Sequence, residues 1–339
     1  MSLAHILGVF LVSATSSWLG CRYLLPRLSA AGMWDAPNHR SLHARRVPRG
    51  AGLAIAAVGL VMLAWLVAIE LLPARSGGIL FLAGTGFAFL GWDDDRHDRS
   101  AVLRLICQFS LAIFCVYGIG LTGDFDGAYW WGTGFVVFGF VWHVNVFNFM
   151  DGADGFAAVQ AILVCIAICA LNALNSHSGI ALWAAAVAAA TIGFLYWNWA
   201  PAKMFLGDCG SYFLGYVIAA LIFISYLSGA SFAALVILIA PFVTDATLTL
   251  IWRALRGQPW WRAHRSHAYQ RLVLCGRAPA QVAFGLAALN VALCWPLSWL
   301  ASRSTHDNVV ALFAYILTGI MWASIVRANG DTESTSPGA

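Results

Sequence analysis

Residues 145–155 read NVFNFMDGADG and place two amides and two carboxylates, at a spacing of three, between two long apolar runs. On a helix, Asn145, Asn148, Asp151 and Asp154 would share one slowly drifting face. Ionisable groups are costly in hydrocarbon unless they are paired, so this face must meet protein, water or a cation. Taken alone, the segment also has a simpler interpretation, a polar helix end at a membrane surface.

The apolar runs on either side are typical of the whole chain. Hydrophobic residues make up 61% of its 339 residues and charged residues 10%, against roughly 25% charged in an ordinary soluble domain. A membrane span needs ~20 apolar residues, and we place such runs at residues 3–25, 51–72, 77–92, 101–121, 131–150, 156–174, 179–197, 211–227, 231–252, 280–300 and 309–326. We therefore predict an all-α polytopic transmembrane helical bundle of about eleven spans, or ten. It forms a single membrane domain at residues 1–328, followed by a disordered polar cytoplasmic tail at residues 329–339.

Basic residues are distributed unevenly between the two faces. When the loops are numbered alternately, nearly all arginines fall on one face, which leaves only Arg75 and Arg303 on the other. The positive-inside rule makes the rich face cytoplasmic, which puts the N-terminus outside. The net charge of +4 thus reflects the basic residues gathered on the cytoplasmic face, and it does not predict a nucleic-acid partner. The eight cysteines are scattered and predict neither disulfides nor a metal site.

Two early segments on the cytoplasmic face carry unusual polar residues. Residues 35–52, DAPNHRSLHARRVPRGAG, combine arginines that could hold phosphate with glycines that allow close backbone approach. A plain basic loop is the simpler interpretation there. Residues 91–100, GWDDDRHDRS, crowd four aspartates at a span end. A solvated acidic loop fits poorly, because like charges so close raise one another's pKa values and basic residues are favoured on this face.

Two later segments complete the set. Residues 198–211, NWAPAKMFLGDCGS, place Asp208 at the start of a span, where it could cap free amides or help to bind a metal-bound phosphate. The inner loop at residues 253–277 holds His264 and His267 among arginines, which suits an anion site or an interfacial basic helix. Hard oxygen ligands for Mg²⁺ beside a phosphate-binding set predict phosphoryl transfer at a membrane surface, with the active site on the cytoplasmic face.

These segments, in this order, resemble the polyprenyl-phosphate N-acetylhexosamine-1-phosphate transferases, the family that includes MraY, WecA and the WbpL-type enzymes. The matching elements are DAPNHRSLH with its later proline and glycines, the paired aspartates Asp94 and Asp95, NVFNFMDGADG, the segment at residues 198–211, and Pro241 with Asp245. The family usually carries HxHH or HHH in its last loop. Here HRSH stands at residues 264–267, a variant that is similar to the WbpL-type branch.

The resemblance implies a Mg²⁺-dependent enzyme, with Mn²⁺ as an alternative metal, in the bacterial inner (cytoplasmic) membrane. It would transfer N-acetylhexosamine 1-phosphate from a UDP-sugar of the GlcNAc, QuiNAc or FucNAc type to undecaprenyl phosphate. UMP would be released, and O-antigen or related surface polysaccharide synthesis would begin. Besides these two substrates and membrane lipid, the partner could be a second copy in a homodimer. The implied catalytic residues are Asp94, Asp95, Asp151, His264 and His267, the substrate-binding residues are Arg40, His43, Asn145, Asp154, Asn198, Phe205 and Arg265, and the metal ligands are Asp208 and Asn148.

Two other functions are compatible with parts of the sequence. A peptidoglycan-precursor transferase acting on a peptide-bearing sugar would share most of these elements, although the divergent histidine loop argues against it. A secondary transporter would carry its polar residues near mid-span and often shows internal repeats. In this sequence the polar residues cluster at the inner ends of the spans, which favours the enzyme.

Overall fold

The computed structural model describes residues 3–37, 42, 45–120, 130–259, 261 and 264–328. Arg40, His43 and the predicted tail lie outside the described residues. The helices are α1 (Leu3–Ala30), α2 (Gly52–Ala68), α3 (Ala74–His97), α4 (Ala101–Gly120), α5 (Trp130–Phe149), α6 (Phe156–Leu174), α7 (Ser178–Asn198), α8 (Gly207–Leu227), α9 (Phe232–Ile237), α10 (Ala240–Leu255), α11 (Ala268–Leu274), α12 (Pro279–Leu289), the π-helix η2 (Asn290–Cys294), α13 (Trp295–Ala301) and α14 (Asp307–Ala328). A short antiparallel pair is formed by β1 (Trp34–Asp35) and β2 (Val47–Pro48).

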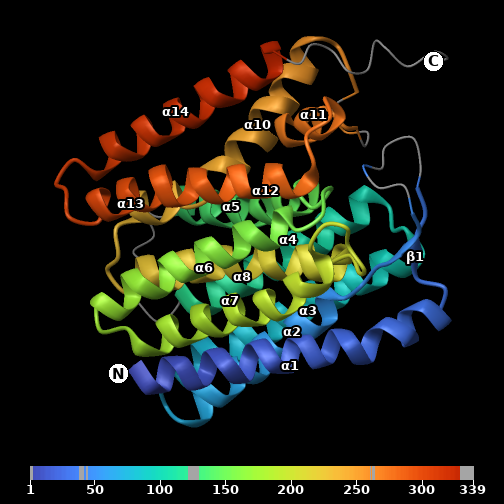
Figure 1. Cartoon of the computed structure of the whole chain (residues 1–339). Helices are drawn as coiled ribbons and strands as arrows, with labels where there is room; N and C mark the ends of the chain where they lie inside the picture. The colour runs from blue at the N-terminus through green and yellow to red at the C-terminus, as the bar shows by residue number, and fades with distance from the viewer. Residues whose placement is uncertain are drawn as a thin grey trace.

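The helices lie side by side as a bundle (Figure 1), and each of the eleven predicted runs coincides with helix. Within the described part of the chain, eight helices are long and apolar enough to cross a membrane. This agrees with the prediction of an all-α, multi-pass membrane protein. The three other predicted spans correspond to α1, to the shorter α2, and to α9 with α10. The total of eleven and the outward N-terminus therefore stay predictions.

The run at residues 231–252 is not the single helix that we expected. A turn at residues 238–239 separates α9 from α10, with Pro241 in the first turn of α10, where its missing N–H costs no hydrogen bond. The carbonyls freed by the break are satisfied by other helices, since Gln160 Nε2 donates to Leu238 O at 3.0 Å and Tyr315 Oη donates to Val236 O at 3.0 Å. The break is therefore a stable feature that lets α10 diverge from the bundle beside α14 (Figure 1).

Helix α8 is the centre around which the candidate site is assembled. It is almost entirely buried and packs against α3 and α5. The close approach of α3 depends on Gly91, where a Cβ atom would collide with the backbone carbonyl of Asp208. As a result, the ends of α3, α5 and α8 that carry aspartates and an asparagine meet at one end of the bundle, opposite the N-terminus in Figure 1.

The first loop is attached to this same end by backbone hydrogen bonds. Phe205 N donates to Pro48 O at 2.8 Å, Ala51 N donates to Phe205 O at 3.1 Å, and Gly52 N donates to Leu206 O at 2.9 Å. These bonds join two segments about 150 residues apart in the chain, in a parallel bridge between Arg49 and Phe205. The loop thereby becomes one wall of the candidate site.

Candidate functional site

A cavity of about 240 Å³ lies where these segments meet. The predicted site residues that line it are Asp95, Asn148, Asp151, Asp154, Asn198, Phe205 and Asp208. The lining also includes Asp35, Arg49, Gln270 and Pro279, to which the sequence analysis gave no individual role. Five of the lining side chains are aspartates, and Arg49 is the one lysine or arginine among the described residues at this cavity.

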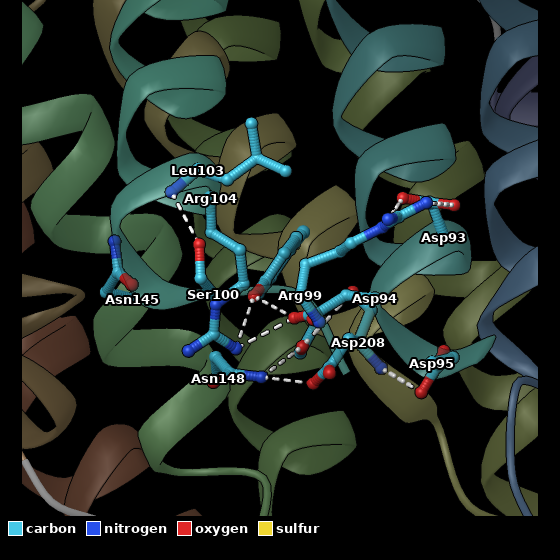
Figure 2. A network of polar contacts seen from close by, with 12 residues as sticks. Asp93, Asp94, Asp95, Arg99, Ser100, Leu103, Arg104, Asn145, Asn148 and Asp208 are labelled. Atoms are coloured by element: carbon cyan, nitrogen blue, oxygen red, sulfur yellow. Dashed lines mark hydrogen bonds and ion pairs between the residues drawn. The ribbon is translucent and has the colours of Figure 1, made fainter. Parts of the chain in front are cut away.

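Two of the predicted residues make direct contact across the cavity wall. Asn148, in the last turn of α5, donates from Nδ2 to Asp208 Oδ1 at 2.6 Å and to Ser211 Oγ at 3.1 Å (Figure 2). Asp208 lies in the first turn of α8. The sequence predicted that these two residues serve one metal site, and the fold brings them together from positions 60 residues apart.

The polar stripe at residues 145–155 is only partly helical, contrary to our expectation. Helix α5 ends at Phe149, and Gly155 adopts a left-handed conformation with φ of +74° before α6 begins. Asp151 and Asp154 therefore reach the cavity from a loop. Asn145 does not line it, since its Nδ2 donates to Gln108 Oε1 and to Val141 O, both at 2.7 Å.

The paired aspartates at the end of α3 are held by donors from the protein. Asp95 accepts from the backbone N–H groups of Asp208 and Cys209, both at 3.1 Å, and so caps the N-terminus of α8. Asp94 accepts from Arg99 N, Arg104 Nη1 and Tyr212 Oη, each at 2.8 Å. Because both carboxylates already accept hydrogen bonds from the protein, these contacts favour a positioning role for Asp94 and Asp95 over proton abstraction.

Arg104 and Tyr212 belong to this network, although the sequence analysis counted Arg104 only as a cytoplasmic charge. The available signal was its place in the first turn of an apolar run, where a solvated arginine is unusual. Asp93, in contrast, faces away from the cavity. It contacts Arg99 Nε at 2.6 Å (Figure 2) and His97 Nδ1 at 2.8 Å, so Asp93 belongs to a surface cluster.

Asp154 and Asn198 shape the opposite wall. Asp154 Oδ2 accepts from Ala202 N at 2.9 Å. The Asn198 amide is buried, with Oδ1 accepting from Gly155 N at 3.0 Å and Nδ2 donating to Met204 O at 3.0 Å. These bonds fix the loop that carries Phe205, whose partly exposed ring lines the cavity.

The histidine loop (residues 264–267) lies beside the end of α5, and residues of α5 and α10 hold it in place. The imidazole of His267 is buried and stacks on Phe149, with ring centroids 6.3 Å apart and an interplanar angle of 22°. Asp245 of α10 accepts from Ala268 N at 2.8 Å and from Tyr269 N at 3.2 Å, which caps α11 from a neighbouring helix. Tyr269 Oη donates to Phe149 O at 3.0 Å and ties the loop to the polar segment.

The charges in this loop differ from those that the sequence suggested. Burial, followed by electrostatic interactions with His267, Arg253 and Arg271, lowers the pKa of His264 to about 3, so this histidine is neutral near pH 7. The guanidinium groups of Arg253 and Arg271 are buried and hold Ser266, whose Oγ accepts from Arg253 Nη1 at 2.7 Å and whose carbonyl accepts from Arg271 Nε at 2.9 Å. Arg265 is partly exposed. None of these residues lines the 240 Å³ cavity.

A divalent cation is compatible with the oxygen donors of the cavity. Burial and the charges of Asp208, Asp95 and Asp35 raise the pKa of Asp151 well above its usual value, as expected for carboxylates that lack a counter-ion. The described residues contain no group of three His, Cys, Asp or Glu side chains arranged for a metal, but Mg²⁺ commonly takes one or two carboxylates together with water and substrate phosphates. Asn148 would coordinate through Oδ1 if its amide oxygen and nitrogen exchanged places.

A second cavity of about 400 Å³ adjoins the first and is largely apolar. It is lined mainly by α10, α12 and α14, with Arg277 and Asp245 as charged members. Met150 and Tyr269 line the apolar cavity, and the residues that follow them in the chain, Asp151 and Gln270, line the acidic one. The acidic cavity and the apolar cavity are therefore separated by these two pairs of consecutive residues.

Comparison with known proteins gives matches over most of the chain. The family model of glycosyl transferase family 4 matches residues 78–227. A Bacillus subtilis protein described as an undecaprenyl-phosphate N-acetylglucosaminyl 1-phosphate transferase is 30% identical over 72% of this chain and 71% of its own length. A decaprenyl-phosphate N-acetylglucosaminephosphotransferase of Mycobacterium tuberculosis is 28% identical over 91% of this chain and 85% of that protein. A phospho-N-acetylmuramoyl-pentapeptide-transferase of Heliobacterium modesticaldum is 33% identical over 48% of this chain and 56% of that protein.

Proposed function

The chain belongs to the family of polyprenyl-phosphate N-acetylhexosamine-1-phosphate transferases, and on that premise we propose that it transfers N-acetylhexosamine 1-phosphate from a UDP-sugar to undecaprenyl phosphate. UMP is the second product. The reaction takes place at the cytoplasmic face of a bacterial inner membrane. Its lipid-linked product is the first intermediate of O-antigen or a related surface polysaccharide.

The observation that carries this proposal is the contact between Asn148 and Asp208 inside a cavity lined by aspartates. A cavity this acidic repels a phosphate unless a cation is present, so a metal-dependent reaction of a phosphate suits it. The adjoining apolar cavity offers a compartment for an isoprenoid tail next to the charged one. A secondary transporter would not need this pairing of compartments at one end of the bundle.

The reaction is an in-line displacement at the sugar-linked phosphorus. An oxygen of the lipid phosphate forms a new bond to this phosphorus, the bond from phosphorus to the UMP oxygen breaks, and UMP leaves with the bonding electrons. Asp208 and Asn148, with Asp151 close by, would hold Mg²⁺ or Mn²⁺, and the bound cation would supply positive charge to the phosphate oxygens. Asp95 fixes the backbone of Asp208, so the carboxylate is oriented before substrate arrives.

The remaining predicted residues are assigned by their contacts, either in the wall of the cavity or in the segments beside it. The ring of Phe205 is available to stack on the uracil, while Asp154 and Asn198 fix the surrounding wall. Asp94 orients Arg104. His264, Arg265 and His267 act on the diphosphate or the sugar from the loop above the end of α5, with His264 as a neutral hydrogen-bonding group.

The experiment that tests this function is UMP release by the purified protein with undecaprenyl phosphate and a panel of UDP-sugars. The panel contains UDP-GlcNAc, UDP-QuiNAc, UDP-FucNAc and the UDP-muramoyl-pentapeptide, the last because peptidoglycan-precursor transferases are among the relatives. We expect release with at least one of the first three, and its loss on chelation of divalent cations. Release only with the muramoyl-pentapeptide would assign the chain to peptidoglycan synthesis, and no release with any donor would contradict the proposal.

A further inference from the structure

Among the described residues, one guanidinium group lines the acidic cavity, and neither the motif comparison nor the metal proposal gives it an individual role. Arg49 follows β2 and lines the cavity together with Asp35, Asp95, Asp151 and Asp208. One divalent cation would balance only two of the three carboxylates of Asp95, Asp151 and Asp208. A phosphate entering this space therefore needs a further cation close to it.

The backbone of Arg49 is fixed on both sides. Its own N–H donates to Met33 O at 3.0 Å, and it forms the parallel bridge with Phe205 that joins the first loop to the segment before α8. Gly50, with φ of +103°, follows at once, and a Cβ on Gly52 would collide with the backbone of Gly210. The loop therefore lies directly on the N-terminus of α8, and the Arg49 side chain starts from a defined position beside Asp208.

The guanidinium has hydrogen-bonding capacity left over after its contacts within the protein. Nη2 donates to the backbone carbonyl of Asp95 at 2.6 Å. Nε is 3.8 Å from Asp95 Oδ1 and has no hydrogen-bond partner among the described residues. The carboxylate of Asp95 already accepts from Asp208 N and Cys209 N, so it does not form a bidentate pair with Arg49. The side chain remains 37% exposed.

From this arrangement we propose that Arg49 is a substrate-binding residue whose guanidinium donates hydrogen bonds to a phosphate oxygen in the cavity. Arginine presents a planar set of five donors that matches phosphate, and one of them is already used to aim the group at the cavity. The role rests on the proposed function. Two phosphates could occupy the position, the phosphate of the lipid acceptor or the diphosphate of the donor, and the experiment separates them.

The experiment compares Arg49→Ala and Arg49→Lys with Arg46→Ala, an exposed arginine of the same loop, in the UMP-release assay. We expect Arg49→Ala to lose about 10- to 100-fold in kcat/KM, because a charge-assisted contact is worth roughly 1.5 to 3 kcal/mol. Arg49→Lys should recover part of this loss, and guanidinium ion added to Arg49→Ala should restore part of it. A higher KM for undecaprenyl phosphate alone assigns the contact to the acceptor, and a higher KM for the UDP-sugar alone assigns it to the donor.

Two results would overturn the proposal. In the first, Arg49→Ala is as active as Arg46→Ala. In the second, activity falls together with thermal stability and guanidinium restores neither, which would make Arg49 only a clasp between the first loop and Asp95.

If the wild-type protein releases no UMP with any donor, the proposed function fails and Arg49 is tested by binding alone. Pyrophosphate with Mg²⁺ should then raise the Tm of the wild type and of Arg46→Ala but not that of Arg49→Ala. An equal rise in all three would contradict phosphate binding by Arg49.

Discussion

The acidic cavity and the histidine loop are both dense in charged residues, but the structure uses the charges in opposite ways. At the cavity, Asn148 and Asp208 reach a shared space from helix ends that the packing of α5 against α8 holds in place, and Asp151 reaches it from the short loop after α5. In the loop, the buried guanidinium groups of Arg253 and Arg271 face Ser266 and hold the loop itself. Helix packing already holds the side chains at the helix ends in place, so their polar atoms can bind a ligand. A long loop instead needs hydrogen bonds from some of its own polar groups to stay ordered.

We expect the largest effect from removing a carboxylate of the acidic cavity. Asp208→Asn should lower kcat for UMP release by a factor of order 10³ or more, because a metal-ligating carboxylate is lost at the reacting centre. The matched control is Asp93→Asn on the same end of the bundle, since Asp93 pairs outward with His97 and Arg99. We expect the control to stay close to wild type, and equal losses in the two variants would contradict the assignment of the cavity.

A second prediction concerns Asp245, whose carboxylate supports the histidine loop through α11. Asp245→Asn should lower kcat/KM by about 10- to 100-fold, because Asp245 accepts two backbone hydrogen bonds from α11, an asparagine amide can accept only one of them, and a charge-assisted bond is worth roughly 1.5 to 3 kcal/mol. Hydrogen exchange should rise across residues 264–274 in this variant and not in Asp208→Asn. Unchanged exchange in the loop would show that Asp245 does not hold it.

A third prediction tests whether Ser266 stabilises the histidine loop or contacts the sugar of the donor. Ser266→Ala removes the acceptor for Arg253 Nη1 and should cost about tenfold in kcat/KM, within the range for a hydrogen bond to a charged group. Because the hydroxyl faces Arg253, the loss should be the same for UDP-GlcNAc and for the preferred UDP-sugar. A changed ratio between donors would mean that Ser266 contacts the sugar.

The smallest expected effect concerns pH and stability. The folded state retains the proton of Asp151 in a range where the unfolded chain, with a carboxyl pKa of about 3.9, has released it. Without divalent cations, the stability contributed by this group is therefore greatest below about pH 4 and declines as the pH rises toward the raised pKa. Added Mg²⁺ should raise the Tm more at about pH 8 than at about pH 5, and Asp151→Asn should weaken that difference. A larger rise at the lower pH would contradict this account.

The helical bundle and the gathering of polar span ends on one face could be predicted from local signals, whereas the pairing of Asn148 with Asp208 was implied only by the family resemblance. Apolar runs of span length define helices, and polar residues at the ends of spans on one face converge when those spans pack. The predicted run at residues 131–150 matches the end of α5 at Phe149, but a helical face shared by residues 145–154 was wrong, because the period-three pattern continues past the end of the helix.

Other features depend on contacts that spacing does not encode. Asp245 caps α11 from 23 residues away, and Arg49 reaches the cavity only because Phe205 pairs with the first loop. The turn between α9 and α10 likewise needs donors from α6 and α14 to satisfy its carbonyls. In each case the residue type was visible in the sequence, and the partner that gives it a role was supplied by the fold.

Mn²⁺ binding, measured by electron paramagnetic resonance, tests most directly whether the cavity between α5 and α8 holds a divalent cation. The titration compares wild type, Asp208→Asn and Asp93→Asn in detergent, with and without UDP. We predict about one tightly bound Mn²⁺ per chain in wild type and in Asp93→Asn, tighter with UDP, and none at the same concentration in Asp208→Asn. Undiminished Mn²⁺ binding in Asp208→Asn would contradict a cation site in this cavity.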